Sequence, residues 1–294
     1  RAVVRAPGRK QGEIRPDLGG RIPAARIVQR GVPVDASRVA LFRACCGDDR
    51  RDPGKAPAVF VETLFIGLMA EGVLGRDFPV SPFGLIQIRQ RIVEREPVAV
   101  GSMLDLSTHL SALRETDRGW EIDFAMAARA GGSGGEPLWE GTATMLSRNA
   151  ATRSRKGSPA GRGPGARSGA RDPERDRARI VEVPGDTGRR YAAASGDYNP
   201  HHLYPITARL FGYRRPIAHG MWTLARTVAI AGEEGLAAGP VELEASFKRP
   251  VFMPGRIDVG LAAGGGGAVE FMVTDPRDGS PHLAGTILGR GKGR

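Results

Sequence analysis

The sequence predicts an α+β protein built from two copies of one module, each an antiparallel sheet wrapped around a central helix. Three observations support this fold class. Two mostly apolar stretches, 59–74 and 217–231, have the length and composition of helices buried against a sheet. Each stretch is followed by turns and by alternating segments typical of antiparallel strands. A polar segment, 149–179, separates the two copies.

The two modules repeat one order of elements. In the first, the helix at 59–74 precedes strands within 84–110 and a last strand at 138–148. In the second, the helix at 217–231 precedes strands within 241–263 and a last strand at 282–290. A module of this size buries its helix only under a curved sheet, so the repeat predicts two tandem modules. The glycine run 264–267 lacks the Lys-Ser or Lys-Thr and the helix of a phosphate-binding loop, and we expect a turn there.

Two segments are expected to lie outside the modules. Residues 1–30 are rich in arginine and poor in acidic residues, which favours a flexible N-terminal extension. Residues 149–179 consist mostly of Gly, Ser, Pro, Ala and Arg, which is typical of a flexible linker. This segment could instead be an arm for an anionic partner. The first module is therefore placed at 31–148 and the second at 180–294.

Length and composition agree with this organisation. The chain has 294 residues, of which 40% are hydrophobic, and this is enough for one large domain or two ordinary ones. The longest apolar run falls short of the roughly 18 residues that span a bilayer, so we expect no membrane span. Two adjacent cysteines, Cys45 and Cys46, predict neither a disulfide framework nor a cysteine zinc site. This cysteine usage fits a cytoplasmic protein.

The formal net charge of +11 suggests a nucleic-acid partner, but the distribution of charge does not. Residues 1–30 hold eight basic and two acidic residues, and residues 149–179 hold nine and three. The modules at 31–148 and 180–289 hold 13 basic and 16 acidic, and ten basic and 11 acidic residues, respectively. Nucleic-acid binding would require basic residues and aromatics on the folded surface. We therefore expect no nucleic-acid partner, and this class remains a rival that a salt-dependent gel shift would test.

The densest group of reactive side chains lies at 191–222. Asp197, Asn199 and His202 fall in one short turn around Pro200. A carboxylate beside an imidazole can orient it, raise its basicity and share a bound water, as proton transfer requires. Two alternatives stay open: a surface turn in which Asp197 and Asn199 cap backbone donors, and a metal site. The metal site would use Asp197, His201, His202 and His219.

Gly220 follows this turn at the expected start of the second helix. Its amide would have no acceptor within the helix and would align with the helix dipole. The missing side chain would let a carbonyl oxygen approach, so this amide is a candidate oxyanion donor. Together with the turn, it predicts chemistry beside a polarised carbonyl.

These segments resemble the signature of a known family. Residues 195–202, SGDYNPHH, are similar to the hydratase motif of the MaoC-like dehydratases, the family of (R)-specific enoyl-CoA hydratases, and IAHGM at 217–221 resembles its downstream motif. The resemblance implies a double hot-dog fold, in which each sheet wraps a long helix. It is strong over 180–289 and mostly architectural over 31–148. Segment 46–53 offers Gly47 and Asp48 but no histidine, so the first module is interpreted as a degenerate copy.

The resemblance also implies roles. Asp197 and His202 would be the catalytic pair, Asn199 and Ser195 would support the site, and the Gly220 amide would bind the thioester oxygen. The implied reaction interconverts trans-2-enoyl and (3R)-hydroxyacyl thioesters of CoA or of an acyl-carrier protein, with no cofactor and no metal. A hot-dog acyl thioesterase and a non-catalytic acyl-thioester-binding protein are the alternatives. Either the two modules pair within the chain or the chain forms a homodimer.

Candidate substrate-binding residues are basic or imidazole side chains of the second module. They are His219, Arg214, Arg215, Lys248 and Arg249. The four basic ones could contact the CoA or carrier part of the substrate, or they could form a solvated face.

Overall fold

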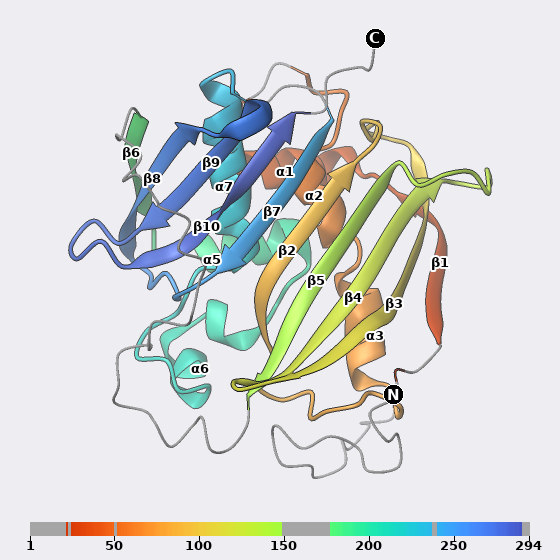
Figure 1. Ribbon diagram of the computed structural model, residues 1–294, viewed down its shortest axis with the longest axis horizontal. Helices are drawn as coiled ribbons and strands as arrows, with labels where there is room; N and C mark the ends of the chain where they lie inside the picture. Colours follow the sequence, from red (N-terminus) through yellow and green to blue (C-terminus); the bar gives the residue numbers. More distant parts are fainter. Residues whose placement is uncertain (1–21, 23–24, 50–51, 149–176, 237–239, 290–294) are drawn as a thin grey trace.

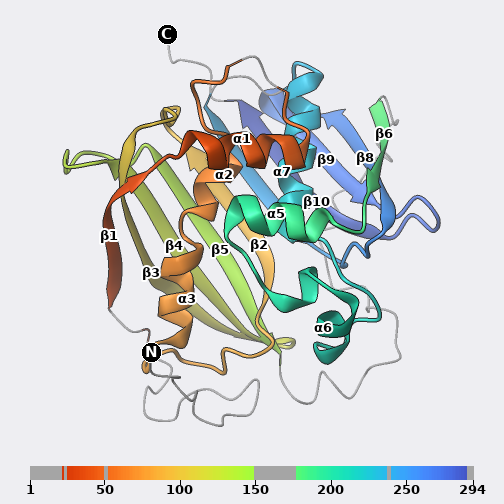
Figure 2. The same ribbon diagram turned by 180° about the vertical axis from the view of Figure 1, so that it is seen from behind.

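The structure is a computed structural model that describes residue 22 and residues 25–49, 52–148, 177–236 and 240–289. The strands of these residues form one continuous antiparallel sheet (Figure 1). The view from behind shows the main helices gathered on one face of this sheet (Figure 2). The opposite face carries no helix within the described ranges.

The two halves of the chain follow one order of elements. The first half contains β1 (Arg26–Pro33), α1 (Ala36–Cys46), α2 (Ala58–Thr63), α3 (Ile66–Leu74), β2 (Ile86–Glu94), β3 (Met103–Thr116), β4 (Gly119–Ala130) and β5 (Trp139–Arg148). The second half contains β6 (Arg177–Val183), α5 (Thr187–Ser195), η2 (Pro200–His202), α6 (Pro205–Leu210), α7 (Gly220–Glu233), β7 (Val241–Phe247), β8 (Gly255–Ala263), η3 (Gly265–Gly267), β9 (Ala268–Thr274) and β10 (Pro281–Gly289). The segment 264–267 thus connects two strands, as predicted.

The strand order has internal symmetry. The sheet runs β1-β3-β4-β5-β2 and then β7-β10-β9-β8-β6, so each half mirrors the other. The halves join where β2 pairs with β7, from Arg89 opposite Ser246 to Val93 opposite Glu242. This order confirms the predicted α+β fold of two sheet-and-helix modules.

The helix α7 lies at the centre of the second module. Ten of its 14 residues are buried, because apolar side chains occupy nearly all of its faces. It begins at Gly220 and not at the predicted residue 217, since Ile217 forms a β-bridge with Phe252. This bridge fixes the chain that leads from the candidate turn into the helix.

The matching helix of the first module is divided in two. A single helix was predicted over 59–74, but α2 ends at Thr63 and α3 begins at Ile66. The amides of Leu64 and Phe65 donate to the carbonyls three residues earlier, Val61 and Glu62. Bonds of this kind tighten the turn and interrupt the regular α-helical pattern.

Strands begin inside both segments that were expected to be flexible. β1 starts at Arg26, within 1–30, and β6 starts at Arg177, within 149–179. β1 pairs with β3 and β6 pairs with β8, at the two edges of the sheet. Pairing on one side satisfies half of each strand's backbone groups, which lets arginine-rich segments become edge strands. The remainder of both segments lies outside the described residues.

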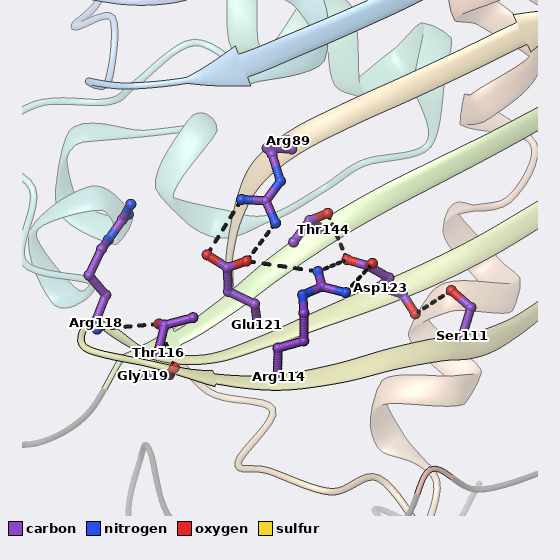
Figure 3. A network of polar contacts seen from close by, with 9 residues as sticks. All are labelled: Arg89, Ser111, Arg114, Thr116, Arg118, Gly119, Glu121, Asp123 and Thr144. Carbon is purple, nitrogen blue, oxygen red and sulfur yellow. Dashed lines mark hydrogen bonds and ion pairs between the residues drawn. The ribbon is translucent and has the colours of Figure 1, made fainter. Parts of the chain in front are cut away.

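The face of the sheet away from the helices carries a polar network (Figure 3). Arg89 of β2 pairs with Glu121 of β4, and Arg114 of β3 makes two hydrogen bonds of 2.7 Å to Asp123. Asp123 also accepts a 2.7 Å bond from the Thr144 hydroxyl of β5. Ile122, which lies between Glu121 and Asp123 on β4, faces the core. The network therefore links four strands of the first module without touching the helix side.

Candidate functional site

The candidate turn is held by hydrogen bonds from its own residues. Gly196, with φ 84°, ends α5 and directs the chain toward Asp197. The Asp197 amide donates to the Ser195 hydroxyl at 3.1 Å, and the Asn199 amide donates to Oδ1 of Asp197 at 3.1 Å. The Asn199 carbonyl then accepts from the His202 amide at 3.0 Å. Asp197 caps a backbone donor, as the surface-turn alternative expected, but Asn199 takes part through its backbone and His202 is buried instead of lying on the surface.

The imidazole of His202 has a defined tautomer. Its Nδ1 lies 2.7 Å from the carbonyl oxygen of Ile217, and a carbonyl can only accept, so Nδ1 carries the proton. This leaves Nε2 with a free lone pair. Burial lowers the pKa of His202 well below its ordinary value, and the adjacent imidazoles of His219 and His201 lower it further. His202 is therefore a neutral base at physiological pH.

The imidazole of His219 stacks on that of His202, with ring centroids 3.7 Å apart. His219 directly precedes α7, and its Nε2 donates to the Asp197 carbonyl at 3.0 Å. Burial lowers the pKa of His219 to about 3. Since the ring is neutral at pH 7, its 3.7 Å approach to Oδ2 of Asp197 is not an ion pair. His219 thus ties the turn to the central helix.

Three side chains converge at this point. A carboxylate oxygen of Asp197 and one ring nitrogen each of His202 and His219 lie within 4.8 Å of one another. Such a group can hold and deprotonate a water molecule. The same residue types also bind divalent metals. The absence of a metal stays a prediction.

Gly220 begins α7 beside this cluster. Its amide lies in the first turn and has no acceptor within the helix. A Cβ at this position would lie 2.9 Å from Cδ1 of Phe247. Glycine is therefore needed for the close approach of the Phe247 ring, a reason that the sequence does not reveal.

The basic residues predicted as carrier contacts lie in two groups. The guanidinium groups of Arg214 and Arg215 lie 4.6 and 5.7 Å from the centre of the Phe252 ring. Arg215 also borders a cavity of about 430 Å³ between β6, β8 and the turn after β9. Arg249 instead bonds the Ser280 hydroxyl, while the Lys248 amide donates to the carbonyl of His282.

Two buried polar residues near the site were not predicted. Glu62, on α2 of the first module, is 3% exposed, and burial together with the charge of Asp197 raises its pKa to about 8. The Tyr191 ring lies 4.8 Å from that of His219, and its buried hydroxyl has no hydrogen-bond partner among the described residues. A lone carboxyl within the apolar sequence VFVETLFIG was a signal for Glu62.

The first module repeats the start of the turn without its imidazole groups. Gly47 ends α1 with φ 62°, as Gly196 ends α5, so Asp48 is the counterpart of Asp197. The Asp48 carboxylate lies 3.7 Å from the Arg43 guanidinium. Residues 46–53 contain no histidine, although 50 and 51 lie outside the described residues.

Comparisons with known proteins relate this chain to a known family. Residues 169–275 match the family model described as MaoC like domain. The chain is 28% identical over 268 residues to 3-hydroxyacyl-thioester dehydratase X of Mycobacterium tuberculosis, covering 91% of this chain and 90% of that protein. It is 38% identical over 65 residues to the (R)-specific enoyl-CoA hydratase of Aeromonas caviae, covering 21% of this chain and 48% of the relative.

Solved structures of other proteins have a similar fold. The crystal structure of HtdX of Mycobacterium tuberculosis matches with a TM-score of 0.72 at 26% identity, over 90% of this chain and all of that one. A Mycobacterium tuberculosis protein described as a double hot-dog fold matches with a TM-score of 0.57 at 14% identity, over 92% of this chain and 97% of that one. The second half of the chain therefore contains a MaoC-like dehydratase domain, and the fold is that of double hot-dog proteins. Its named relatives are a hydratase and a dehydratase, and the chain is an enzyme of this lyase class.

Within the ranges that the structure describes, no helix is long and apolar enough to cross a membrane.

Proposed function

We propose that this chain interconverts trans-2-enoyl thioesters and (3R)-hydroxyacyl thioesters, with His202 and Asp197 as the catalytic pair. The observation that carries the proposal is the bond from Nδ1 of His202 to the Ile217 carbonyl, which leaves the lone pair of Nε2 free on a ring that has one nitrogen within 4.8 Å of an Asp197 carboxylate oxygen. The names of the relatives supply the substrate class.

In the hydration direction, water adds across the double bond. Nε2 of His202 takes a proton from water while the water oxygen bonds to the β-carbon. Asp197 holds the same water, and the proton that Nε2 has taken is passed on to the α-carbon, so one water molecule is added in total and Nε2 is free again. The Gly220 amide stabilises the negative charge that develops on the thioester oxygen. Asn199 and Ser195 hold the turn, through the bonds that involve their backbone amide and hydroxyl, respectively.

Two substitutions test the catalytic pair. We expect His202→Ala and Asp197→Asn to lower the turnover of crotonyl-CoA by about 100- to 10,000-fold, since a placed proton-transfer group contributes about this factor. His109→Ala on β3 is the matched control, because it removes an imidazole far from the turn. Absorbance of the enoyl thioester follows the reaction, and thermal melting checks the fold. Wild-type turnover by His202→Ala would remove His202 from the mechanism.

The same substrate, followed by a second readout, separates the alternatives. A hot-dog thioesterase would release free thiol, whereas a hydratase conserves the thioester, so a thiol-reactive dye distinguishes them. A non-catalytic binding protein would bind crotonyl-CoA and change neither signal. The cytoplasmic location and the domain boundaries stay predictions.

A further inference from the structure

The short helix α6 exposes its apolar side chains. Ile206 and Leu210 are four residues apart, so they share one face of the helix, and they are 72% and 81% exposed. Ala208, on the opposite side, is fully buried. The flanking rings of Tyr204 and Phe211 are 51% and 49% exposed. We call these four exposed residues the α6 surface: Tyr204, Ile206, Leu210 and Phe211. Exposed apolar side chains that are grouped in this way are typical of interaction sites, whereas single ones are common on any protein surface.

The α6 surface is fixed to the candidate turn. The Thr207 hydroxyl of α6 donates to the Pro200 carbonyl at 2.6 Å. The ring of Phe211 lies 5.5 Å from that of His201, which in turn lies 4.0 Å from the ring of His202. A partner on the α6 surface would therefore sit directly over the residues proposed to carry the reaction.

Positive charge borders the α6 surface. Residues 187–218 contain one acidic residue, Asp197, which belongs to the site. They contain five arginines, of which Arg189 and Arg209 lie at the α6 surface, while Arg214 and Arg215 lie against Phe252 and Arg190 lies near Cys45 of α1. The guanidinium of Arg189 lies 5.3 Å from the centre of the Tyr204 ring, and exposed Arg209 shares the face of Ile206. The surface therefore complements a partner that is apolar at its centre and acidic around it.

Three occupants have different consequences for these side chains. A second copy of the chain, paired about a two-fold axis, would place this cationic face against itself. A free CoA headgroup would engage arginines but would leave Ile206 and Leu210 exposed. An acidic protein with an apolar contact face satisfies both the arginines and the apolar side chains.

We propose that the α6 surface docks an acidic carrier protein that presents the acyl thioester on its phosphopantetheine arm. This inference rests on the proposed function and names the carrier on which the substrate arrives. Docking over the turn would bring the thioester to the residues of the site while the carrier itself stays on the surface.

The test compares one acyl group on two carriers. The crotonyl thioesters of a bacterial acyl-carrier protein and of CoA are each assayed with the wild type, Leu210→Glu and Arg209→Glu. We expect each substitution to lower kcat/KM for the protein-borne substrate about tenfold or more and to change the value for crotonyl-CoA less than twofold. Arg209→Glu should also flatten the dependence of kcat/KM on salt. Met272→Glu is the control, since it places the same charge at an exposed apolar position on β9.

Two other results would overturn the proposal, and a third would overturn the proposed function alone. An equal loss on both substrates would mean that the α6 surface contacts the acyl chain or CoA. If Leu210→Glu left kcat/KM unchanged on both substrates but converted a wild-type dimer into a monomer, the α6 surface would bind a second copy of the chain. If the wild type hydrates neither thioester, the proposed function fails; titration of the wild type and Leu210→Glu with the crotonylated carrier protein then still decides whether docking occurs.

Discussion

Glu62 is a carboxyl group of the first module beside the candidate site of the second. All six residues of α2 are buried, and Glu62 has both Asp197 and Tyr191 within electrostatic reach. Burial, and next the negative charge of Asp197, raise its pKa to about 8. Glu62 is therefore mostly protonated at pH 7, and the module that lacks the reactive histidine still contributes a polar group near the site.

This protonation makes a prediction about stability. An unfolded glutamate loses its proton near pH 4.5, whereas folded Glu62 keeps it up to about pH 8. Between these values the folded state binds more protons, so the free energy of unfolding falls as the pH rises, by up to about 1.4 kcal/mol per pH unit. Glu62→Gln has no such proton, so its stability relative to the wild type should increase from pH 5 to pH 8. Denaturant unfolding at several pH values measures this.

The exposed glutamate Glu115 provides the control for that series. Glu115→Gln removes a carboxyl from the solvent side of β3 and should leave the pH dependence of the wild type unchanged. If the curves of the wild type and Glu62→Gln run parallel from pH 5 to pH 8, Glu62 is ionised in the folded protein.

At the scale of the elements, α5 and η2 approach so closely at Gly188 that only glycine fits there. A Cβ on Gly188 of α5 would lie 2.0 Å from the carbonyl oxygen of His202. We expect Gly188→Ala to displace η2, because a backbone oxygen cannot yield to a methyl group at that distance, and to lower kcat/KM at least about tenfold. The enoyl-thioester assay measures the loss, and circular dichroism reports whether the fold is kept.

A second glycine serves as the comparison. Gly67 of α3 has open space around its missing Cβ. Gly67→Ala should leave activity unchanged and stabilise the helix by up to about 1 kcal/mol. Full activity in Gly188→Ala would show that α5 does not position the catalytic turn.

These elements explain how far the sequence alone could predict the site. Asp197, Asn199 and His202 share a short turn, so their proximity follows from local chemistry, and the apolar pattern of α7 indicates a buried helix. The contact of Gly188 with His202 and that of Gly220 with Phe247 depend on tertiary packing, which leaves no local pattern. Helices α1 and α5 were also missed. Only three of the 11 residues of α1 are buried, and the buried residues of α5 are mostly small, so neither helix has a strong apolar pattern.

At the scale of the whole molecule, one sheet unites both modules. β2 and β7 continue the backbone pairing across the junction, so the helices of both modules share one covered face. This continuity lets α2 place Glu62 near a turn that begins 135 residues later in the chain. The sequence repeat predicts two modules, but the pairing of particular strands between them depends on long-range register and was not predicted.

The distribution of charge changes with the observed edges of the sheet. Arg26 and Arg30 lie in β1, and Arg177 and Arg179 lie in β6, so part of the positive charge assigned to flexible segments belongs to folded strands. The modules are close to neutral, and most of the excess charge still lies outside the described residues. A truncated chain should therefore begin just before β1, at residue 25, and not at residue 31.

A pair of truncations tests the role of β1. A chain that starts at residue 34 loses the strand, whose Ile27 and Val32 pack against the core and whose backbone pairs with β3 from Arg26 opposite His109 to Pro33 opposite Met103. We expect its Tm to fall by about 5 °C or more, on a scale of about 2–4 °C per kcal/mol, and its newly exposed β3 edge to promote aggregation. A chain that starts at residue 25 keeps the strand and should melt within about 2 °C of the full chain. Equal melting of both truncations would mean that β1 does not stabilise the sheet, so calorimetry and light scattering on the two chains decide whether the arginine-rich N-terminal segment is partly structural.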